Sequence, residues 1–230
     1  MRKLIFLLVI VSYSQSSFSQ DVNLLVQKVK DKLGRVNDYV ASGRMKTNVI
    51  FLKVPIATVK IYFKKPDKLK IKNEKGISFI PKGAVTINMN NILSGSGFTA
   101  IDGGLIKFEN TNVRIVKLLP QDDNNDVVLS TLYIDETNLV IRKAKTTTRD
   151  NGTFELDMSY GKYTEYGLPD KVIFTFNTKD YKMPKGMTFD FDDGAQKKAE
   201  DKMKNRKGKV EIDYSDYIIS KGVEDKVFTN

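Results

Sequence analysis

The chain has 230 residues, of which 40% are hydrophobic, and its 38 basic and 28 acidic residues give a net charge of +10. It contains no histidine and no cysteine. Their absence excludes disulfides, Ser-His-Asp and Cys-His catalysis, and zinc sites built on imidazole or thiolate. The length and apolar content suffice for one domain, or at most two, with a hydrophobic core.

Residues 1–19 have the order of a secretory signal peptide. A basic head, Met1-Arg2-Lys3, precedes an apolar run over residues 4–11 and a polar tail that ends in Ser17-Phe18-Ser19. The apolar run is much shorter than the roughly 20 residues that a spanning helix requires. A buried N-terminal strand is the alternative interpretation. We expect cleavage after Ser19, export, and a mature single domain over residues 20–230.

The mature chain is expected to be a soluble periplasmic monomer. Without cysteine it cannot carry a lipid on an N-terminal cysteine, and no later apolar run approaches spanning length. Losing Arg2 and Lys3 with the signal lowers the 38 basic residues to 36, against 28 acidic ones. Because the lysines are scattered and the chain is exported, we expect no nucleic-acid partner. Anionic lipid surfaces or acidic proteins suit this charge better.

The first predicted element is an amphipathic helix over residues 21–36. Asp21 lies where it can cap or charge the N-terminus, and Gly34 lies near the end. The apolar positions are spaced by three and four, as one helix face requires. They are Val22, Leu25, Val26, Val29, Leu33 and Val36.

From residue 39 the apolar period changes to two, which predicts half-buried antiparallel strands. A turn is expected at residues 73–76, a helix or irregular crossing segment at 84–93, and loops at the glycines between 95 and 104. About ten short strands at regular spacing predict a mainly β fold, a barrel or strongly curved sheet. The strands are expected over residues 39–49, 57–64, 69–72, 105–108, 113–119, 127–134, 139–148, 153–160, 163–166, 171–177 and 209–219.

Two further segments carry their own signals. Arg149-Asp150-Asn151-Gly152 predicts a hairpin, because Asn-Gly supplies two positive-φ positions. Residues 194–207 are nearly all charged or small, and we interpret them as a solvated helix or mobile part of an insertion at about 190–208. A role at a membrane surface is the alternative, although the apolar face is small for insertion.

The acidic residues indicate turns rather than catalysis. They lie mostly at residues 122–126, 135–136 and 150, where turns are predicted. The cluster at residues 190–194 does not fit a calcium loop, because phenylalanines would occupy ligand positions one and three. Phosphate-binding and dinucleotide glycine motifs are absent from the sequence. We therefore expect no enzyme activity, metal or cofactor; a carboxylate hydrolase is the remaining catalytic alternative.

The inner face of a curved sheet is either filled by side chains or left as a cavity. The pattern alone does not separate a ligand cavity from an ordinary core sealed by the N-terminal helix. The candidate lining residues are Ile61, Phe63, Leu69, Ile71, Phe79, Ile106, Phe108, Ile115, Leu129 and Leu132.

The order of elements resembles that of the LolA/LolB-type lipoprotein carriers. Residues 61–71, Ile-Tyr-Phe-Lys-Lys-Pro-Asp-Lys-Leu-Lys-Ile, are similar to the family's strand that ends in a basic pair and proline, followed at once by an alternating strand. Residues 132–143 are similar to a later hairpin of the family. Residues 167–172 and 210–217 also fit, so the resemblance covers most of the chain.

The resemblance implies an unclosed β-barrel of about eleven antiparallel strands, with helices forming a lid over a hydrophobic cavity. It also implies a carrier that binds the acyl chains of lipoproteins, or lipids, and moves them toward the outer membrane between membrane-bound loading and receiving proteins. In the family an arginine before the proline holds the lid closed. Lys65 takes that place here and keeps the charge without the planar fork.

The missing cysteine fits the soluble carrier of this family rather than its lipid-anchored receptor. The alternative function is a non-catalytic periplasmic β-protein that senses or binds a lipoprotein or a partner protein on the same scaffold.

Overall fold

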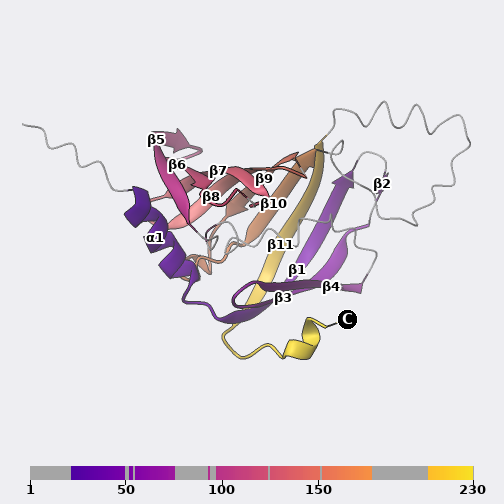
Figure 1. The fold of residues 1–230 in the computed structure, drawn as a ribbon. Coiled ribbons are helices and arrows are strands. Elements are labelled where there is room, and N and C mark those ends of the chain that lie inside the picture. The colour runs from indigo at the N-terminus through magenta and orange to yellow at the C-terminus, as the bar shows by residue number, and fades with distance from the viewer. Residues whose placement is uncertain are drawn as a thin grey trace, which may run out of the picture.

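Eleven strands pair in one antiparallel sheet, which is strongly curved and does not close (Figure 1). The computed structural model describes residues 22–49, 52–53, 55–75, 93, 97–123, 125–150, 152–177 and 207–229. In this part of the chain the edge strands β4 and β5 do not pair with each other, which leaves the sheet open. The sequence pattern predicts the mainly β fold with its N-terminal helix, and the family resemblance implies that the sheet is unclosed; both are confirmed.

The strand order along the sheet is β4-β3-β1-β11-β10-β9-β8-β7-β6-β5, and β2 pairs with β1. The elements are α1 (Val22–Leu33), β1 (Asp38–Val49), β2 (Leu52–Lys53), β3 (Ala57–Lys64), β4 (Lys68–Lys75), β5 (Phe98–Phe108), β6 (Thr111–Pro120), β7 (Val127–Asp135), β8 (Val140–Thr148), β9 (Gly152–Ser159), η1 (Thr164–Tyr166), β10 (Lys171–Asn177), β11 (Lys207–Ile219) and η2 (Asp225–Val227).

Helix α1 lies against the β5–β8 side of the sheet and contacts β5 and η1 (Figure 1). Its apolar face enters the main core, which also contains residues of β6 and β7. The helix ends at Leu33, where the Gly34 amide donates to the Lys30 carbonyl at 2.7 Å. Val36 is buried just beyond the helix end rather than within the last turn. One half of the concave face is therefore filled by the helix.

Residues 163–166 do not form the predicted strand. Thr164–Tyr166 is a 3₁₀-helix, closed by hydrogen bonds from the Thr164 amide and hydroxyl to the Gly161 carbonyl at 3.2 and 2.7 Å. Gly167 ends it with a φ of 69°, a left-handed conformation that glycine adopts without strain. The first tyrosine of this segment, Tyr163, packs on Tyr217 of β11 at 4.9 Å between ring centroids.

Two predicted irregular segments belong to strands instead. Strand β4 continues through the expected turn to Lys75, which pairs with Thr58; polar residues suit this exposed edge strand. Strand β5 begins at Phe98 and passes through Gly103 and Gly104 at an irregularity in its pairing with β6. A side chain at Gly103 would lie 2.7 Å from that of Ile115, so a glycine is required there by packing, not by a loop.

Several predictions fall outside the described residues. They concern the signal peptide at residues 1–19, the cap at Asp21, the segments from 76 to 92, and most of the charged insertion at about 190–208. Among the residues that are described, no helix has the length and hydropathy needed to cross a membrane.

Ion pairs cover the outer face of the central strands. Lys143 on β8 lies 2.7 Å from Glu155 and 3.0 Å from Asp157, both on β9. The Lys143 hydrogen bond lowers the pKa of Glu155 below its usual range, against the opposing effect of burial. Lys171 bridges Glu211 and Asp213 of β11 in the same way.

Replacing Lys143 by Met should reduce the amount by which the free energy of unfolding falls as the pH is lowered. A carboxylate whose pKa is depressed by folding stabilises the fold above its unfolded pKa, and that contribution disappears as pH falls through the folded value. We expect Lys143→Met to lower the free energy of unfolding by about 1 kcal/mol at pH 7. Urea titrations should show a smaller difference from wild type well below pH 4, where carboxylates protonate.

The matched control is Lys107→Met, because Lys107 is exposed and forms no ion pair within the described residues. Its stability should follow wild type at both pH values. Equal effects of the two substitutions at pH 7 would contradict this role for Lys143.

Candidate ligand-binding pocket

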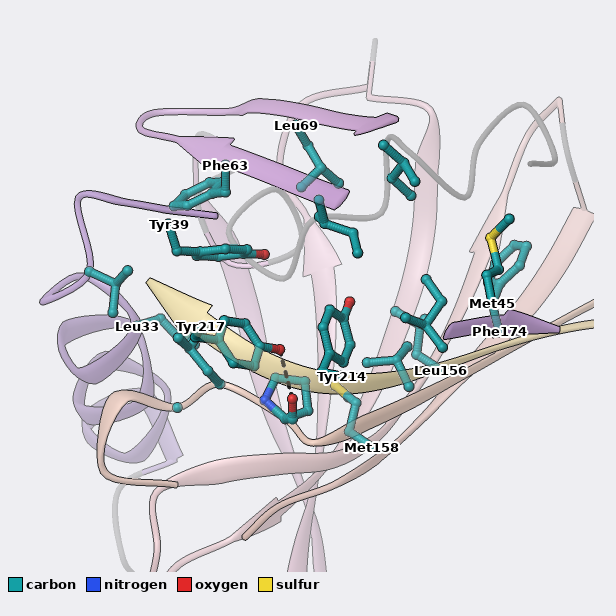
Figure 2. Close-up of a pocket in the computed structure, with 18 of the residues that line it drawn as sticks. Leu33, Tyr39, Met45, Phe63, Leu69, Leu156, Met158, Phe174, Tyr214 and Tyr217 are labelled. Atoms are coloured by element: carbon teal, nitrogen blue, oxygen red, sulfur yellow. Dashed lines mark hydrogen bonds between the residues drawn. The ribbon is translucent and has the colours of Figure 1, made fainter. Parts of the chain in front are cut away.

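An apolar pocket lies between the β3–β4 hairpin and strands β9–β11, beside the C-terminal end of α1 (Figure 2). Its cavity volume is about 130 Å³, and none of the described residues that line it is charged. The lining residues are Leu33, Val36, Tyr39, Met45, Ile61, Phe63, Leu69, Ile71, Leu156, Met158, Gly167, Leu168, Pro169, Val172, Phe174, Val210, Ile212, Tyr214 and Tyr217.

The β3–β4 hairpin forms one wall of the pocket through alternate residues. Ile61 pairs with Ile71, and Phe63 pairs with Leu69, so all four side chains lie on the same face. Tyr62 and Lys70, which alternate with them and pair with each other, take the opposite, outer face. The alternation that predicts these strands thus also places their apolar side chains in this wall.

The opposite wall consists of cross-strand rows on β9, β10 and β11. In antiparallel pairs, residues directly opposite each other lie on one face of the sheet. The observed register therefore aligns apolar side chains from three strands that are distant in sequence. These rows are Leu156, Phe174 and Val210, and beside them Met158, Val172 and Ile212.

Aromatic rings gather at the end of the pocket nearest α1. Tyr39 lies 5.1 Å from Phe63 and 5.4 Å from Tyr217, measured between ring centroids. Tyr217 also contacts Tyr163 at 4.9 Å and Tyr214 at 5.2 Å. Aromatic pairs at these separations stabilise the packing beyond their area of contact. Tyr217 is the centre of this group and connects the two walls.

The tyrosine hydroxyls at this end differ in their hydrogen bonding. The Tyr217 hydroxyl donates to the Pro169 carbonyl at 2.7 Å, whereas the hydroxyl ends of Tyr39 and Tyr214 point into the pocket (Figure 2). Burial raises the pKa of all three phenols well above their usual value. All three hydroxyls therefore remain protonated at neutral pH.

Lys65 connects the β3–β4 turn to the segment that follows α1. Its ammonium group donates to the Gly34 carbonyl, just beyond the helix, and to the Asn37 side chain at 3.1 Å. The Lys65 backbone amide donates to the Asn37 carbonyl at 2.9 Å. A cation at this point also interacts favourably with the C-terminal end of the helix dipole.

Comparison with solved structures places this architecture among known proteins. A LolA superfamily protein from Nitrosomonas europaea is 10% identical to the chain, with a TM-score of 0.52 over 90% of this chain and 97% of that one. A domain from Vibrio parahaemolyticus named for outer membrane lipoprotein sorting is 10% identical, with a TM-score of 0.55 over 89% and 95%. The chain has the LolA fold.

A third structure with this fold extends the comparison. It is a protein of the DUF1329 family from Desulfovibrio piger, 12% identical, with a TM-score of 0.56 over 90% of this chain and 96% of that chain. No protein-family model and no curated protein matches the sequence. The likeness to the LolA fold is therefore one of architecture.

Within this LolA fold, the pocket includes four of the ten candidate lining residues, those on the β3–β4 hairpin. Leu132 is instead fully buried in the main core, in the cluster that contains the apolar face of α1. Phe79 lies outside the described residues.

The remaining four candidates lie away from the pocket. Ile115 pairs with Tyr133, whose ring contacts Phe108 at 5.7 Å, and this face is opposite to that of buried Leu132. Leu129 lies on β7 four residues before Tyr133 and therefore on the same outer face. Ile106 is 37% exposed on edge strand β5. Apolar character alone does not show which face of a strand carries the cavity.

Sequence reasoning missed the β9–β11 wall and the tyrosines. Alternation in residues 154–158, 172–176 and 210–214 is a signal for that wall, because each segment presents an apolar residue at every second position. Whether these positions lie opposite Ile61 and Phe63 depends on the pairing of β1 with β11. That pairing joins distant parts of the sequence.

Among the described residues, no carboxylate lines this pocket. Buried Asp135 accepts hydrogen bonds from the Thr137 and Asn138 amides at 3.0 and 2.9 Å, which is turn chemistry as the sequence predicts. Glu155 and Asp157 face Lys143 on the outer surface. Within the described residues, no three acidic side chains gather into a group that could hold a metal ion.

Lys65→Leu should loosen the connection between the hairpin and the helix end. Because the leucine donates no hydrogen bond to Gly34 or Asn37, we expect a loss of about 1 kcal/mol in local stability. Amide exchange over residues 33–40, followed by mass spectrometry, should then be about fivefold faster.

Lys72→Leu provides the control, since Lys72 lies on the same hairpin and contacts only the Tyr62 ring, at 5.5 Å, among the described interactions. Exchange over residues 33–40 should remain at the wild-type rate in this variant. An unchanged rate in Lys65→Leu would reject the anchoring role.

Proposed function

We propose that the mature chain is a soluble periplasmic carrier that binds an acyl chain of a lipoprotein or lipid and moves it toward the outer membrane. The observation that carries this proposal is the uncharged apolar pocket, formed within one copy of a LolA fold. The signal-peptide pattern of residues 1–19 supports export. The names of two structural neighbours, LolA superfamily and lipoprotein sorting, support the class of cargo.

The pocket has the chemistry that acyl binding requires. Each methylene removed from water contributes about 0.8 kcal/mol, so even part of a chain provides substantial affinity without any charged contact. Aliphatic residues, phenylalanines and two methionines line the space. Methionine side chains adapt to irregular apolar surfaces, which suits a flexible chain.

Its volume indicates that the observed pocket is a closed form. A cavity of about 150 Å³ lined by apolar residues accommodates benzene, so about 130 Å³ holds only a few carbons of an acyl chain. Loading a longer segment requires the walls to separate. We infer that the β3–β4 hairpin moves, because β4 is an edge strand that pairs only with β3 among the described strands.

Lys65 supports the same proposal as a gating residue. It joins the mobile wall to the end of α1 through Gly34 and Asn37. The resemblance of residues 61–71 to the LolA/LolB-type carriers implies that Lys65 takes the place of the arginine that holds their lid closed. We expect Lys65→Leu to release a bound acyl ligand several-fold faster than wild type in a stopped-flow measurement; unchanged release would reject the gating role.

Extraction of a lipopeptide from vesicles tests the carrier proposal. Vesicles of phosphatidylethanolamine and phosphatidylglycerol would contain a fluorescent triacylated lipopeptide, and the mature chain would be added without detergent. We expect the lipopeptide to appear in a soluble complex with the protein after the vesicles are sedimented. Native mass spectrometry of that complex should show one lipopeptide on one chain.

Ile71→Gln and Ile173→Gln form a matched pair for this assay. Ile71 lines the pocket, whereas Ile173 lies between Asp157 and Glu211 on the outer face of the neighbouring strands. We expect Ile71→Gln to weaken lipopeptide binding about tenfold, since it removes apolar burial worth about 1.5 kcal/mol. Ile173→Gln should bind like wild type.

Two results would reject the carrier. One is a wild-type chain that leaves the lipopeptide in the vesicles and purifies without any acyl ligand. The other is equal loss of binding in the two variants. Retention of a partner protein by a ligand-free chain would favour the alternative, a sensor that uses the same scaffold.

A further inference from the structure

Two tyrosine hydroxyls place polar atoms inside an otherwise apolar pocket. Tyr39 comes from β1 and Tyr214 from β11, and both side chains line the pocket with their hydroxyl ends directed into it (Figure 2). Neither hydroxyl has a hydrogen-bond partner among the described residues. After burial, the nearby Tyr214 phenol is the second cause of the raised pKa of Tyr39, as expected for two groups that share one space.

Phenol groups in this position favour a particular occupant. Burying a hydroxyl without a partner is costly, and a purely hydrocarbon ligand would leave both groups in that state. A ligand with a hydrogen-bond acceptor would satisfy them. Since burial raises the pKa of both phenols, they remain donors at neutral pH.

The surrounding charge distinguishes between kinds of acceptor. A carboxylate that enters an apolar site needs a cation, because desolvating an unpaired charge is far more costly than desolvating a carbonyl. The described lining residues include no lysine or arginine. Lys65, the basic residue of the adjacent turn, is directed to Gly34 and Asn37 instead. The pocket therefore provides donors without providing a counter-ion.

We propose that the pocket selects neutral acyl esters and amides over free fatty acids, with the ligand carbonyl accepting hydrogen bonds from Tyr39 and Tyr214. This inference rests on the proposed carrier function and specifies the ligand class for the same site. Acyl groups attached to a lipoprotein or a glycerolipid have carbonyls of this kind. A free fatty acid has the same chain and a charged end.

The third tyrosine of the pocket provides an internal control. The Tyr217 hydroxyl already donates to the Pro169 carbonyl at 2.7 Å, so it is not available to a ligand. Tyr217→Phe and the pair Tyr39→Phe/Tyr214→Phe remove the same atom from the same kind of ring. Only the pair removes groups that could contact a carbonyl.

Displacement of N-phenyl-1-naphthylamine, a neutral fluorescent probe without a carbonyl, measures the selectivity. The competitors are methyl decanoate and decanoate at pH 8, which share one chain and differ in charge. We expect wild type to bind the ester at least tenfold more tightly than the carboxylate. The Tyr39→Phe/Tyr214→Phe variant should bind the ester about tenfold more weakly and the probe at least as tightly as wild type does, because the probe leaves both hydroxyls unpartnered.

Thermal unfolding tests whether a change in protein stability explains the change in binding. Removing an unpartnered hydroxyl should leave the Tm of Tyr39→Phe/Tyr214→Phe unchanged or higher, whereas Tyr217→Phe should lower it by breaking the bond to Pro169. Tyr217→Phe should nevertheless retain the wild-type ratio of ester to carboxylate affinity. A reduced ratio in Tyr217→Phe would count against specific donors at Tyr39 and Tyr214.

The outcomes separate this inference from the carrier proposal. Equal affinity of wild type for ester and carboxylate, or full ester preference in Tyr39→Phe/Tyr214→Phe, overturns the selectivity and leaves the carrier intact. A wild-type chain that binds neither the probe nor either competitor, and that leaves lipopeptide in vesicles, overturns both.

Discussion

The pairing of β1 with β11 holds the two walls of the pocket in one structure. These strands are separated by most of the chain, and their register extends from Tyr39 opposite Ile219 to Asn48 opposite Lys209. On one side of this pairing lie β3 and β4, and on the other lie β10 and β9. Without it, the hairpin with Ile61 and Phe63 would have no opposite wall.

At Gly43 the backbones of the paired strands β1 and β11 approach each other closely. A side chain there would lie 2.8 Å from the Asp213 carbonyl, beside the irregularity between Ser42 and Gly43. Irregularities of this kind increase strand twist and bending. The curvature that encloses the pocket therefore depends on a residue without a side chain, at a position where β1 changes register.

Most strands follow from local sequence because each must place one apolar face toward the core. Alternation identifies β3 from Ala57 to Phe63, and it assigns Ile61 and Phe63 to one face. The same rule does not identify which face of β6 or β7 borders a cavity. Ile115 and Leu129 are as apolar as the pocket residues, yet the register places them on the outer surface.

The parts of the site that sequence did not indicate arise from contacts between distant segments. The β1–β11 register brings the Tyr39 ring within 5.4 Å of that of Tyr217, and Tyr214, three residues before Tyr217 on β11, stacks on it at 5.2 Å where the register shifts. The 3₁₀-helix at Thr164–Tyr166 likewise depends on Tyr163 packing against Tyr217. The local sequence pattern predicts the strand and the face on which a residue lies, whereas the site also depends on which distant residues pack against it.

The position of Lys65 has a consequence for communication along the molecule. Phe63, which lines the pocket, is only two residues from Lys65, whose ammonium group contacts the carbonyl just beyond α1. In the carrier that we propose, a displacement of the β3–β4 wall on loading would also move the segment just beyond the C-terminal end of α1. A protein that touches only the surface around Gly34 could distinguish a loaded chain from an empty one without reaching the cargo.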